Sequence, residues 1–583
     1  MRDEATPLAV LVAPDDTVDC VIRRMANESR AVQHAGIAVV VDEARVLQGI
    51  LTDGDIRRAY ARNMSWEDPV SSIMIREPIT LPVDIREDEI ILQLADRVEK
   101  AKHLRAKTIK HILLVNDAFQ LVGIRDFAEL LWDREEKSAR VHIIGLGFVG
   151  LTLAISLANI GHRVTGVDTN RALVDSLRAG ESPVFEVGLA AKLKNVIDRG
   201  TLTFENSLEP VGSSIFIIAV GAGYSDTEKA DLSAIADVAE TLGKNLKPGD
   251  QIILRSTVPV GVTTNLLVPL LAQHSGLKIG EEINVSFCPE RTLAGQAITE
   301  LQSLPQIVGG VTHRCTEMAA RFWSALSHSV IKVKNPEVAE MAKLANNAFR
   351  NVSFAFSNEL SFLAEQHNVD VSEVINAANN GYPRNHLPSA SPGVGGYCLP
   401  KDSMFFSESL HRDTSTPSLG ALACQINRHA TEFPIRAFER FCRLTKLQSE
   451  VSTALIIGIA FKGEPETNDL RGSSGLEVAK ILQGKGVTVL VWDAVVTADQ
   501  ASNANLTFTK ELSSTIRQAD SIFVMNNHRQ NISIEPFLRS PTDSPKFLFD
   551  GWKLFDRQAV EAIEGMWYGA PGYLTASQSS TLP

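Results

Sequence analysis

A glycine fingerprint at residues 145–150 constrains the fold of this chain more than any other feature of its sequence. It reads Gly145-Leu146-Gly147-Phe148-Val149-Gly150 and follows an apolar segment that begins at Val141. The first glycine permits a tight turn, the second lets a ligand approach the backbone, and the third lets a helix pack closely on a strand. Strand-like and helix-like segments then alternate to about residue 330, which predicts a doubly wound parallel sheet. The strand candidates are residues 163–167, 214–220, 251–254 and 284–287.

The same fingerprint predicts a dinucleotide site. A helix N-terminus offers free N–H groups and a partial positive charge to phosphates. The predicted pyrophosphate contacts are Gly145, Gly147, Phe148, Val149 and Gly150. The next strand ends at Asp168, 18 residues after Gly150, where a carboxylate accepts hydrogen bonds from a ribose 2′-OH and repels a 2′-phosphate. This favours NAD over NADP, and a glycine-rich turn without a cofactor is the alternative.

Length, charge and cysteines set the broad class. A chain of 583 residues is too long for one core, so we expect several domains. A net charge of -12 gives no basic footprint for nucleic acid or an anionic membrane. The six cysteines form no CxxC pair and no metal-ligand spacing, which indicates a reducing compartment and no metal site. The first residues lack a signal-peptide core and no apolar run could cross a bilayer, so we expect a cytoplasmic protein.

Two similar segments precede the fingerprint. Residues 37–58 and 111–126 share a strand-like run followed by a short polar turn, and helix-like stretches at 17–26 and 86–98 precede them. Such self-similarity predicts two copies of one strand-helix unit packed as a pair. This part resembles a tandem CBS module. The resemblance implies that Thr52 and Asp55 contact the ribose of an adenine nucleotide. The second copy has Asp126 and Glu129 at the matching places, and a structural module without ligand is the alternative.

The rest of the chain predicts a long helix and a second α/β block. Residues 336–366 read as one helix that is apolar on several faces, which is typical of a helix buried on more than one side. We expect it to join two domains or two subunits. Further helices are expected at 372–379 and after Pro417. The second block starts at residue 453, with strands at 487–492, 521–525 and 547–550, and the Ser/Thr-rich tail from Thr575 is predicted to be disordered.

Cys398 predicts the chemistry. It lies in the run Gly393-Val394-Gly395-Gly396-Tyr397-Cys398-Leu399-Pro400-Lys401-Asp402, with a helix expected from Pro400. A thiol near a cation and a helix N-terminus can form the nucleophilic thiolate, and the glycines are expected to leave room for a substrate. A thiol nucleophile combined with a nicotinamide site predicts oxidation of an alcohol past the aldehyde to the acid. Four other cysteines are interpreted as small buried hydrophobes: Cys20, Cys315, Cys424 and Cys442.

From residue 141 to residue 573 the chain resembles the UDP-glucose/GDP-mannose dehydrogenase family of nucleotide-sugar 6-dehydrogenases. Five blocks in the right order carry the resemblance, namely 256–263, 288–291, 340–347, the Cys398 run and 458–462. It implies two Rossmann-like parallel-sheet domains joined by a long central helix and preceded by the tandem CBS module. The implied parts are the CBS module at 1–136, an NAD-binding domain at 139–330, a central helical dimerisation domain at 331–435, a UDP-sugar-binding domain at 450–573 and a tail at 574–583.

The family resemblance also implies a four-electron oxidation at C6 of the sugar with two molecules of NAD. Cys398 would add to the aldehyde as a thiohemiacetal, whose oxidation leaves a thioester that water hydrolyses to the uronate. Lys343 would stabilise the alkoxide, and Asn347, four residues later on the same helical face, would help hold that oxygen. Asp402 would position Lys343 and the water.

Further residue roles come from the same resemblance. Thr257 would bind the hydrolytic water, and Glu290 would act as the base. Implied cofactor contacts are Thr257, Lys401 and Arg471. Implied substrate contacts are Arg291, Lys343, Asn347, Arg384, Gly395, Phe461 and Lys462. Two departures weaken the assignments near the cofactor, because the interval from Phe461 to Arg471 is longer than is usual in the family and residues 220–223 lack its Pro-Thr-Pro.

The sequence favours one class of sugar. Arg291, Gly295 and Val394 match the members that act on UDP-N-acetylhexosamines, as does Arg384, 14 residues before Cys398. The run 399–402 is closer to the UDP-glucose and GDP-mannose members, which therefore stay as alternatives. The resemblance implies that Arg384 reaches its substrate across a subunit interface, so we expect a homodimer or a higher homo-oligomer.

Two rival functions stay open. A single-step dehydrogenase related to the 6-phosphogluconate enzymes would share the dinucleotide fold but lack the thiol nucleophile, and it would reduce one NAD per substrate. The other rival function is that of a nucleotide-sensing binding protein whose enzyme part has lost its activity. The intact set Cys398, Lys343, Asp402, Thr257 and Glu290 argues against decay.

Overall fold

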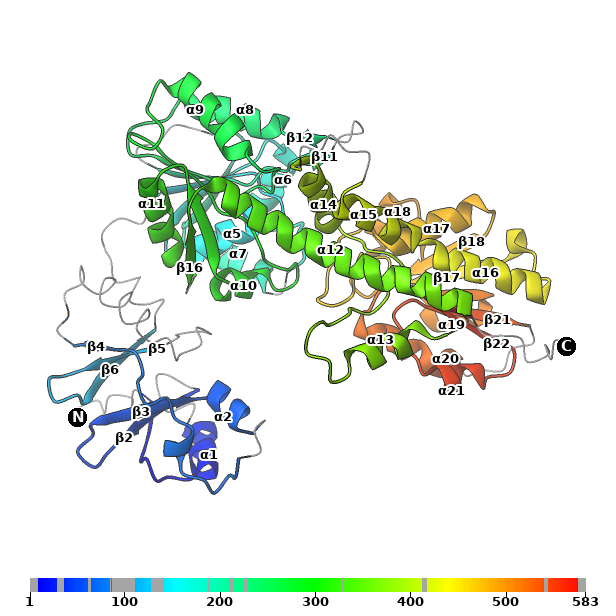
Figure 1. Ribbon diagram of the computed structural model, residues 1–583, viewed down its shortest axis with the longest axis horizontal. Coiled ribbons are helices and arrows are strands. Elements are labelled where there is room, and N and C mark those ends of the chain that lie inside the picture. The colour runs from blue at the N-terminus through cyan, green and yellow to red at the C-terminus, as the bar shows by residue number, and fades with distance from the viewer. Residues whose placement is uncertain are drawn as a thin grey trace. The chain divides into compact units, whose positions relative to one another are not determined.

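The computed structural model divides into two units, Met1–Ser138 and Ala139–Pro583 (Figure 1). It describes residues 9–28, 36–60, 64–83, 85, 111–126, 140–186, 188–208, 214–224, 229–327, 329–367, 369–410, 417–538 and 544–574. The helix expected at 86–98, Glu129, the side chain of Asp126 and the tail from Thr575 lie outside the described residues.

The first unit contains one three-stranded pattern twice. β1 (Val10–Val12) pairs in parallel with β2 (Ile37–Val41), which pairs antiparallel with β3 (Leu47–Thr52). β4 (Thr80–Pro82), β5 (His111–Val115) and β6 (Leu121–Asp126) repeat the same order and directions. The antiparallel register even shifts at the matching place in both copies. The predicted internal repeat is therefore present in the structure, and the first copy also has α1 (Val18–Glu28) and α2 (Asp53–Tyr60).

The first α/β block of the second unit is an eight-stranded sheet in the order β16-β15-β14-β13-β10-β7-β8-β9. Neighbouring residues on its central strands face opposite cores, as Ile143 and Ile144 do, because both faces of the sheet are covered by helices. One pair was not expected, since β15 runs antiparallel to β14. The strands are β7 (Arg140–Ile144), β8 (Arg163–Val167), β9 (Leu202–Glu205), β10 (Ile215–Ile218), β13 (Gln251–Leu254), β14 (Asn284–Phe287), β15 (Gln306–Gly310) and β16 (Val330–Val333).

Helices cover both faces of this sheet. They are α5 (Phe148–Asn159), α6 (Arg171–Arg178), α7 (Leu189–Asp198), α8 (Ser233–Gly243), α9 (Val268–Ser275), α10 (Ala297–Ser303) and α11 (His313–Ser324), with a short hairpin of β11 (Gly223–Tyr224) and β12 (Ala230–Asp231). The predicted strands at 163–167, 251–254 and 284–287 coincide with β8, β13 and β14. These runs could be placed because strands that are buried on both faces are apolar throughout.

The second α/β block repeats the topology of the first. Its sheet has the order β19-β18-β17-β20-β21-β22-β23, so in both sheets the first strand lies between the second and the fourth. Ligands bind at such a switch point, outside the carboxyl ends of the strands, which here means β7 with β10 and β17 with β20. The strands are β17 (Thr453–Ile457), β18 (Thr488–Trp492), β19 (Thr507–Phe508), β20 (Ser521–Val524), β21 (Lys546–Asp550), β22 (Met566–Ala570) and β23 (Tyr573–Leu574). The helices are α17 (Ser474–Gly484), α18 (Ala498–Asn503), α19 (Leu512–Gln518), α20 (Glu535–Leu538) and α21 (Arg557–Glu561).

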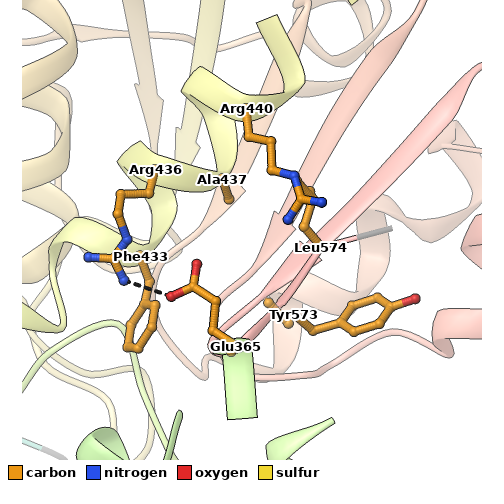
Figure 2. A pocket seen from close by; sticks show the side chains of 9 residues that line it. Glu365, Phe433, Arg436, Ala437, Arg440, Tyr573 and Leu574 are labelled. Carbon is orange, nitrogen blue, oxygen red and sulfur yellow. Dashed lines mark hydrogen bonds and ion pairs between the residues drawn. The ribbon is translucent and has the colours of Figure 1, made fainter. Parts of the chain in front are cut away.

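One long helix, α12 (Pro336–His367), joins the two blocks, as Figure 1 shows. It packs on β14 and β15 at one end and meets α16 at the other, where the Glu365 carboxylate accepts a hydrogen bond from Arg436 Nη2 at 3.0 Å. Figure 2 shows this far end, a small hollow between α12, α16 and the β22–β23 hairpin that Arg440 and Tyr573 also line. The other helices around α12 are α13 (Val371–Asn379), α14 (Cys398–Glu408), α15 (Leu419–His429) and α16 (Glu432–Thr445).

α12 also carries an apolar stripe exposed to solvent. Phe349 is 74% exposed, and Met341, Phe356 and Leu363 are each more than half exposed. Their spacing of seven or eight residues keeps them on one face of the helix. The opposite side buries polar residues, with Asn358 fully buried. Exposed apolar residues on one helix face make this side of α12 a candidate contact surface.

Within the described ranges, no helix is both long enough and apolar enough to span a membrane. The same residues contain no group of His, Cys, Asp and Glu that could hold a metal ion.

Candidate active site

The glycine loop forms a cradle between β7 and α5. Gly145 has φ +95°, and a Cβ there would lie 2.7 Å from the backbone nitrogen of Val220. A Cβ on Gly150 would lie 1.8 Å from the carbonyl oxygen of Gly145, so no side chain fits at either position. Gly147, the N-cap of α5, faces open space within 4 Å. The fold itself needs Gly145 and Gly150. Gly147 leaves free the position that a pyrophosphate takes at a helix N-terminus. The loop therefore fits a dinucleotide.

Asp168 lies beside the glycine loop. Its counterpart in the second block is Asp493, and the different surroundings of the two carboxylates explain why only the first block suits a dinucleotide. Asp168 accepts backbone hydrogen bonds from Leu146 at 2.8 Å and Asn170 at 2.9 Å and stays partly exposed. Asp493, which follows β18 as Asp168 follows β8, is buried. It accepts from four backbone N–H groups, those of Ile459, Ala460, Val495 and Val496. Asp493 therefore has no free face for a ribose, whereas Asp168 has one.

The Cys398 loop lies between the two blocks. On one side the Tyr397 hydroxyl donates to the carbonyl of Ala222, in the loop after β10 and beside the glycine cradle, at 3.1 Å. On the other side the backbone N–H of Gly396 donates to the carbonyl of Arg471 at 3.1 Å. Cys398 is exposed and is the first residue of α14, which begins there rather than at Pro400 as expected. Cys398 thus lies at the carboxyl edge of the first sheet.

The glycines of this loop have a different role from the one predicted. A Cβ on Gly395 would lie 2.7 Å from the carbonyl oxygen of Gly472, and one on Gly396 would lie 2.9 Å from Cε2 of Phe461. A Cβ on Gly393 would meet the methyl group of Thr431 at 2.7 Å. The expectation that these glycines leave room for a substrate is therefore corrected, because protein atoms fill the space on their Cβ side. The glycines allow the loop to pack against the second block.

Lys343, Asn347 and Asp402 come together from two helices. Lys343 and Asn347 lie one turn apart on α12 and are both buried, as their spacing predicts. Asn347 Nδ2 donates to Asp402 Oδ2 at 2.6 Å, and the ammonium of Lys401 lies 3.0 Å from Asp402 Oδ1. The structure therefore pairs Asp402 with Asn347 and Lys401, where the sequence predicted Lys343. The Lys401 ammonium also lies 4.2 Å from the centre of the Phe405 ring, so protein groups hold the side chain that was assigned to the cofactor.

The charges around Cys398 have opposite effects on its thiol. Partial desolvation and the negative charge of Asp402 raise the pKa of the thiol above its ordinary value. The cations of Lys343, Lys401 and Arg471 act in the other direction and do not reverse the shift. This shift runs in the opposite direction to the lowered pKa on which the predicted thiolate depends.

Glu290 lies in a buried ion pair. Arg255 donates to Glu290 Oε2 through Nη2 at 2.6 Å and through Nε at 3.2 Å. The backbone N–H groups of Arg291 and Thr292 both donate to Glu290 Oε1 at 2.7 Å. Although burial alone would raise the pKa of Glu290, Arg255, these hydrogen bonds and the charge of Lys343 together lower it. Sequence analysis missed Arg255, whose only signal was a cation at the end of the apolar run 251–254.

The loops that follow Glu290 and β17 meet each other. Lys462 Nζ donates to the carbonyl of Ala294 at 2.6 Å, and a Cβ on Gly295 would lie 2.7 Å from Pro465 Cβ. Desolvation lowers the pKa of Lys462 to about 8, although Glu186 opposes the shift. Glu186, which was also missed, accepts from the backbone N–H groups of Gly295 and Ala297 at 2.7 and 2.8 Å. The carboxylates of Glu290 and Glu186 thus fix the loop in which the carbonyl of Ala294 accepts the hydrogen bond from Lys462.

Four further residues that the sequence predicts as cofactor or substrate contacts have the surroundings described next. Arg291 donates to the carbonyl of Pro305, and burial lowers its pKa. Arg384 is exposed and lies 5.6 Å from the centre of the Tyr382 ring. Arg471 forms an ion pair with Asp469 at 2.7 Å and lies 4.9 Å from the Tyr397 ring centre. Thr257 follows β13 at the carboxyl edge of the first sheet and is partly buried.

In the first unit, the carboxylate of Asp55 accepts hydrogen bonds from Thr52, three residues earlier in the chain. Asp55 Oδ2 accepts from the backbone N–H of Thr52 at 2.9 Å and from the Thr52 hydroxyl at 2.6 Å. Asp55 is buried, so the structure gives both residues a role at the start of α2.

Comparison with known families agrees with this geometry. Residues 139–327 match the NAD binding domain of the UDP-glucose/GDP-mannose dehydrogenase family, residues 337–429 its central domain, and residues 455–557 its UDP binding domain. Residues 5–62 match the CBS domain.

Individual relatives align over most of their own length. A UDP-N-acetyl-D-mannosamine dehydrogenase of Escherichia coli is 31% identical over 404 residues, which is 67% of this chain and 94% of the relative. An NDP-N-acetyl-D-galactosaminuronic acid dehydrogenase of Ralstonia nicotianae is 32% identical over 397 residues, 67% of this chain and 91% of the relative. A solved UDP-D-ManNAc dehydrogenase from Pyrococcus horikoshii superposes with a TM-score of 0.67 at 27% identity, covering 74% of this chain and 99% of that one.

Proposed function

We propose that this chain, which belongs to the UDP-glucose/GDP-mannose dehydrogenase family and is an NAD-dependent nucleotide-sugar dehydrogenase, oxidises the C6 hydroxyl of a UDP-N-acetylhexosamine to the carboxylate. The observation that carries the covalent route is the position of Cys398. It is exposed, lies within electrostatic reach of Lys343, and follows a tyrosine bonded beside the dinucleotide cradle.

Residues of the first block suit NAD, which when bound accepts the hydride in each of the two oxidations. Gly147 and the N-terminus of α5 are placed to receive the pyrophosphate, and Asp168 the ribose. In the first oxidation the C6 hydroxyl loses its proton to water and C6 loses a hydride. The buried Lys343 ammonium and Asn347 amide stabilise the developing oxyanion, and because they are preorganised no solvent has to rearrange.

Cys398 then captures the aldehyde. A bond forms between its sulfur and C6, and the thiol proton passes to the C6 oxygen. Tethering holds the thiohemiacetal in place for the second loss of hydride, which leaves a thioester. Water adds to the thioester carbon, the C–S bond breaks, and the sulfur regains its proton as the uronate leaves. Asp402, held by Asn347 and Lys401, is placed to orient that water.

The sugar class rests on the relatives and on the loop after β14. The relatives from E. coli and P. horikoshii are named for N-acetylmannosamine and the one from R. nicotianae for N-acetylgalactosaminuronic acid. Arg291 and Gly295, the residues that favoured this class, lie in the loop that contacts Lys462 and Pro465 of the second block. UDP-glucose and GDP-mannose are the alternatives.

A second copy of this chain is the proposed partner of α12. The exposed stripe of Met341, Phe349, Phe356 and Leu363 is continuous along one helix face, as an interface between copies requires. Arg384 is exposed in its own protomer and so is free to serve a neighbouring site. The binding of an adenine nucleotide by the CBS module, and its control of activity, stay predictions.

A substrate screen tests the proposed activity. NADH release from UDP-GlcNAc, UDP-ManNAc and UDP-GalNAc should exceed that from UDP-glucose and GDP-mannose, with two NADH formed per sugar. One NADH per sugar would identify a single-step dehydrogenase instead, and a preference for UDP-glucose would refute the assigned sugar class.

Cys398→Ala should lose uronate formation by about 10³-fold or more, because the nucleophile that tethers the aldehyde is gone. The measurement is uronate and NADH per sugar consumed. Cys424→Ala is the matched control, since that thiol lies nearby against the Pro400 carbonyl and should be dispensable. A Cys398→Ala enzyme with full uronate yield would exclude the covalent route.

The pH dependence should depend on Lys462, whose pKa lies at about 8. Below that pH the side chain is a cation that can bind a diphosphate, and above it the charge is lost. For the nucleotide sugar, kcat/KM should therefore fall about tenfold per pH unit above this value. Lys462→Arg keeps its charge and should remove the fall. An unchanged profile in that variant would mean that another group titrates.

Phe349→Glu should convert the oligomer to monomers, because it places a charge at the centre of the exposed stripe on α12. Light scattering coupled to size exclusion measures the change. Ile532→Glu is the control, as this residue is also exposed and apolar but lies away from α12. Dimers that persist in Phe349→Glu would show that the stripe is not the interface.

A further inference from the structure

The helix that begins at Cys398, α14, is fastened to the first block at both of its ends. At its start the hydroxyl of Tyr397 donates to the carbonyl of Ala222 at 3.1 Å. At its last turn the Glu408 carboxylate accepts a hydrogen bond from the backbone N–H of Ala230 at 3.0 Å. Both partners belong to the segment that forms the β11–β12 hairpin, which lies beside α14 in Figure 1. One segment of the first block therefore holds the helix that carries the thiol.

The contact at the start of α14 lies next to the dinucleotide cradle. Ala222 is buried and comes two residues after Val220, whose backbone nitrogen would lie 2.7 Å from a Cβ on Gly145. A glycine lies on either side of Ala222, and glycine permits backbone conformations that other residues avoid. The hydrogen bond from Tyr397 restricts this freedom, so it ties the position of the thiol loop to that of the cradle.

The ring of Tyr397 makes contacts on the other side of the site. The guanidinium of Arg471, from the loop after β17, lies 4.9 Å from the ring centre, and the ammonium of Lys401 lies 5.4 Å from it. Cations at such distances are attracted to an aromatic ring. Tyr397 thus contacts the first block through its hydroxyl and the second block through its ring, and it is joined by a peptide bond to Cys398.

We propose that Tyr397 is a positioning residue whose hydrogen bond to Ala222 keeps the sulfur of Cys398 at the carbon that loses the hydride, so that the aldehyde is captured before it leaves. The inference rests on the proposed function, since it assigns a role within the covalent route. Capture depends steeply on geometry, because a misplacement of about 1 Å can cost about 10²-fold in rate. The first oxidation does not use the sulfur, so loss of the hydrogen bond should slow capture and leave the first hydride transfer intact.

Tyr397→Phe tests the proposal, because it removes the hydroxyl and keeps the ring beside its cations. The assay uses the full-length enzyme, excess NAD, the nucleotide sugar that it oxidises fastest, and semicarbazide, which traps free aldehyde as the semicarbazone. The first NADH should form within about twofold of the wild-type rate, and the ratio of semicarbazone to uronate should rise about 2- to 12-fold, which corresponds to one net hydrogen bond. A ratio equal to that of the wild type overturns the proposal.

Glu408→Ala is the matched control. It removes the other hydrogen bond between α14 and the hairpin segment, at the end of the helix that is far from the thiol. A purely structural role for these bonds predicts a similar release of aldehyde from both variants, whereas we expect Glu408→Ala to keep the wild-type ratio. An equal rise in Glu408→Ala would show that any loosening of α14 releases the aldehyde, which contradicts a specific role for Tyr397.

Cys398→Ala in the same assay separates this inference from the proposed function. On the covalent route this variant should stop at the aldehyde, with one NADH per sugar and the aldehyde recovered as semicarbazone. Two NADH per sugar from Cys398→Ala would refute the covalent route itself. If Cys398→Ala stops at the aldehyde while Tyr397→Phe behaves as the wild type does, the role of Tyr397 is refuted and the covalent route stands.

Discussion

The arrangement of the active site depends on a backbone contact that only glycine permits. The thiol loop approaches the second block so closely that a Cβ on Gly395 or Gly396 would lie within 3 Å of Gly472 or Phe461. On its other side the same loop is tied to the first block by the hydrogen bond from Tyr397 to Ala222. If these glycines carried side chains, the two blocks would separate and the thiol would leave the edge of the dinucleotide cradle. Room for packing, rather than room for substrate, explains this glycine-rich run.

The two α/β blocks share a strand order but have different chemistry, and one carboxylate in each accounts for the difference. Asp168 and Asp493 occupy the same place after the second strand of their sheets. Asp493 is buried with four backbone donors, two from its own loop and two from the loop after β17, so it holds these loops together. Asp168 makes two such bonds and stays partly exposed, which leaves lone pairs for a ribose. The two blocks thus share a topology but differ in their sites. The first block has the cofactor site, and the second has Phe461 and Lys462 at its switch point.

Charge in the site is balanced rather than uniformly positive. Three cations lie within electrostatic reach of Cys398, yet Asp402 and desolvation leave its pKa raised. The buried anions Asp402 and Glu290 hold the cations in place, Asp402 pairing with Lys401 and Glu290 with Arg255.

The sequence alone determined the features that repeat locally: the apolar strands, the glycine cradle with Asp168, and the 32-residue α12 that places Lys343 and Asn347 on one side. These could be predicted because periodicity and turn chemistry act over a few residues. Only the tertiary structure decided which partner each charged group has. Arg255 was missed because its partners Glu290 and Trp323 lie far along the chain, and Lys401 was not predicted as a partner of Asp402. The energy of a buried charge depends on what packing brings within about 4 Å of it, and no local pattern contains that information.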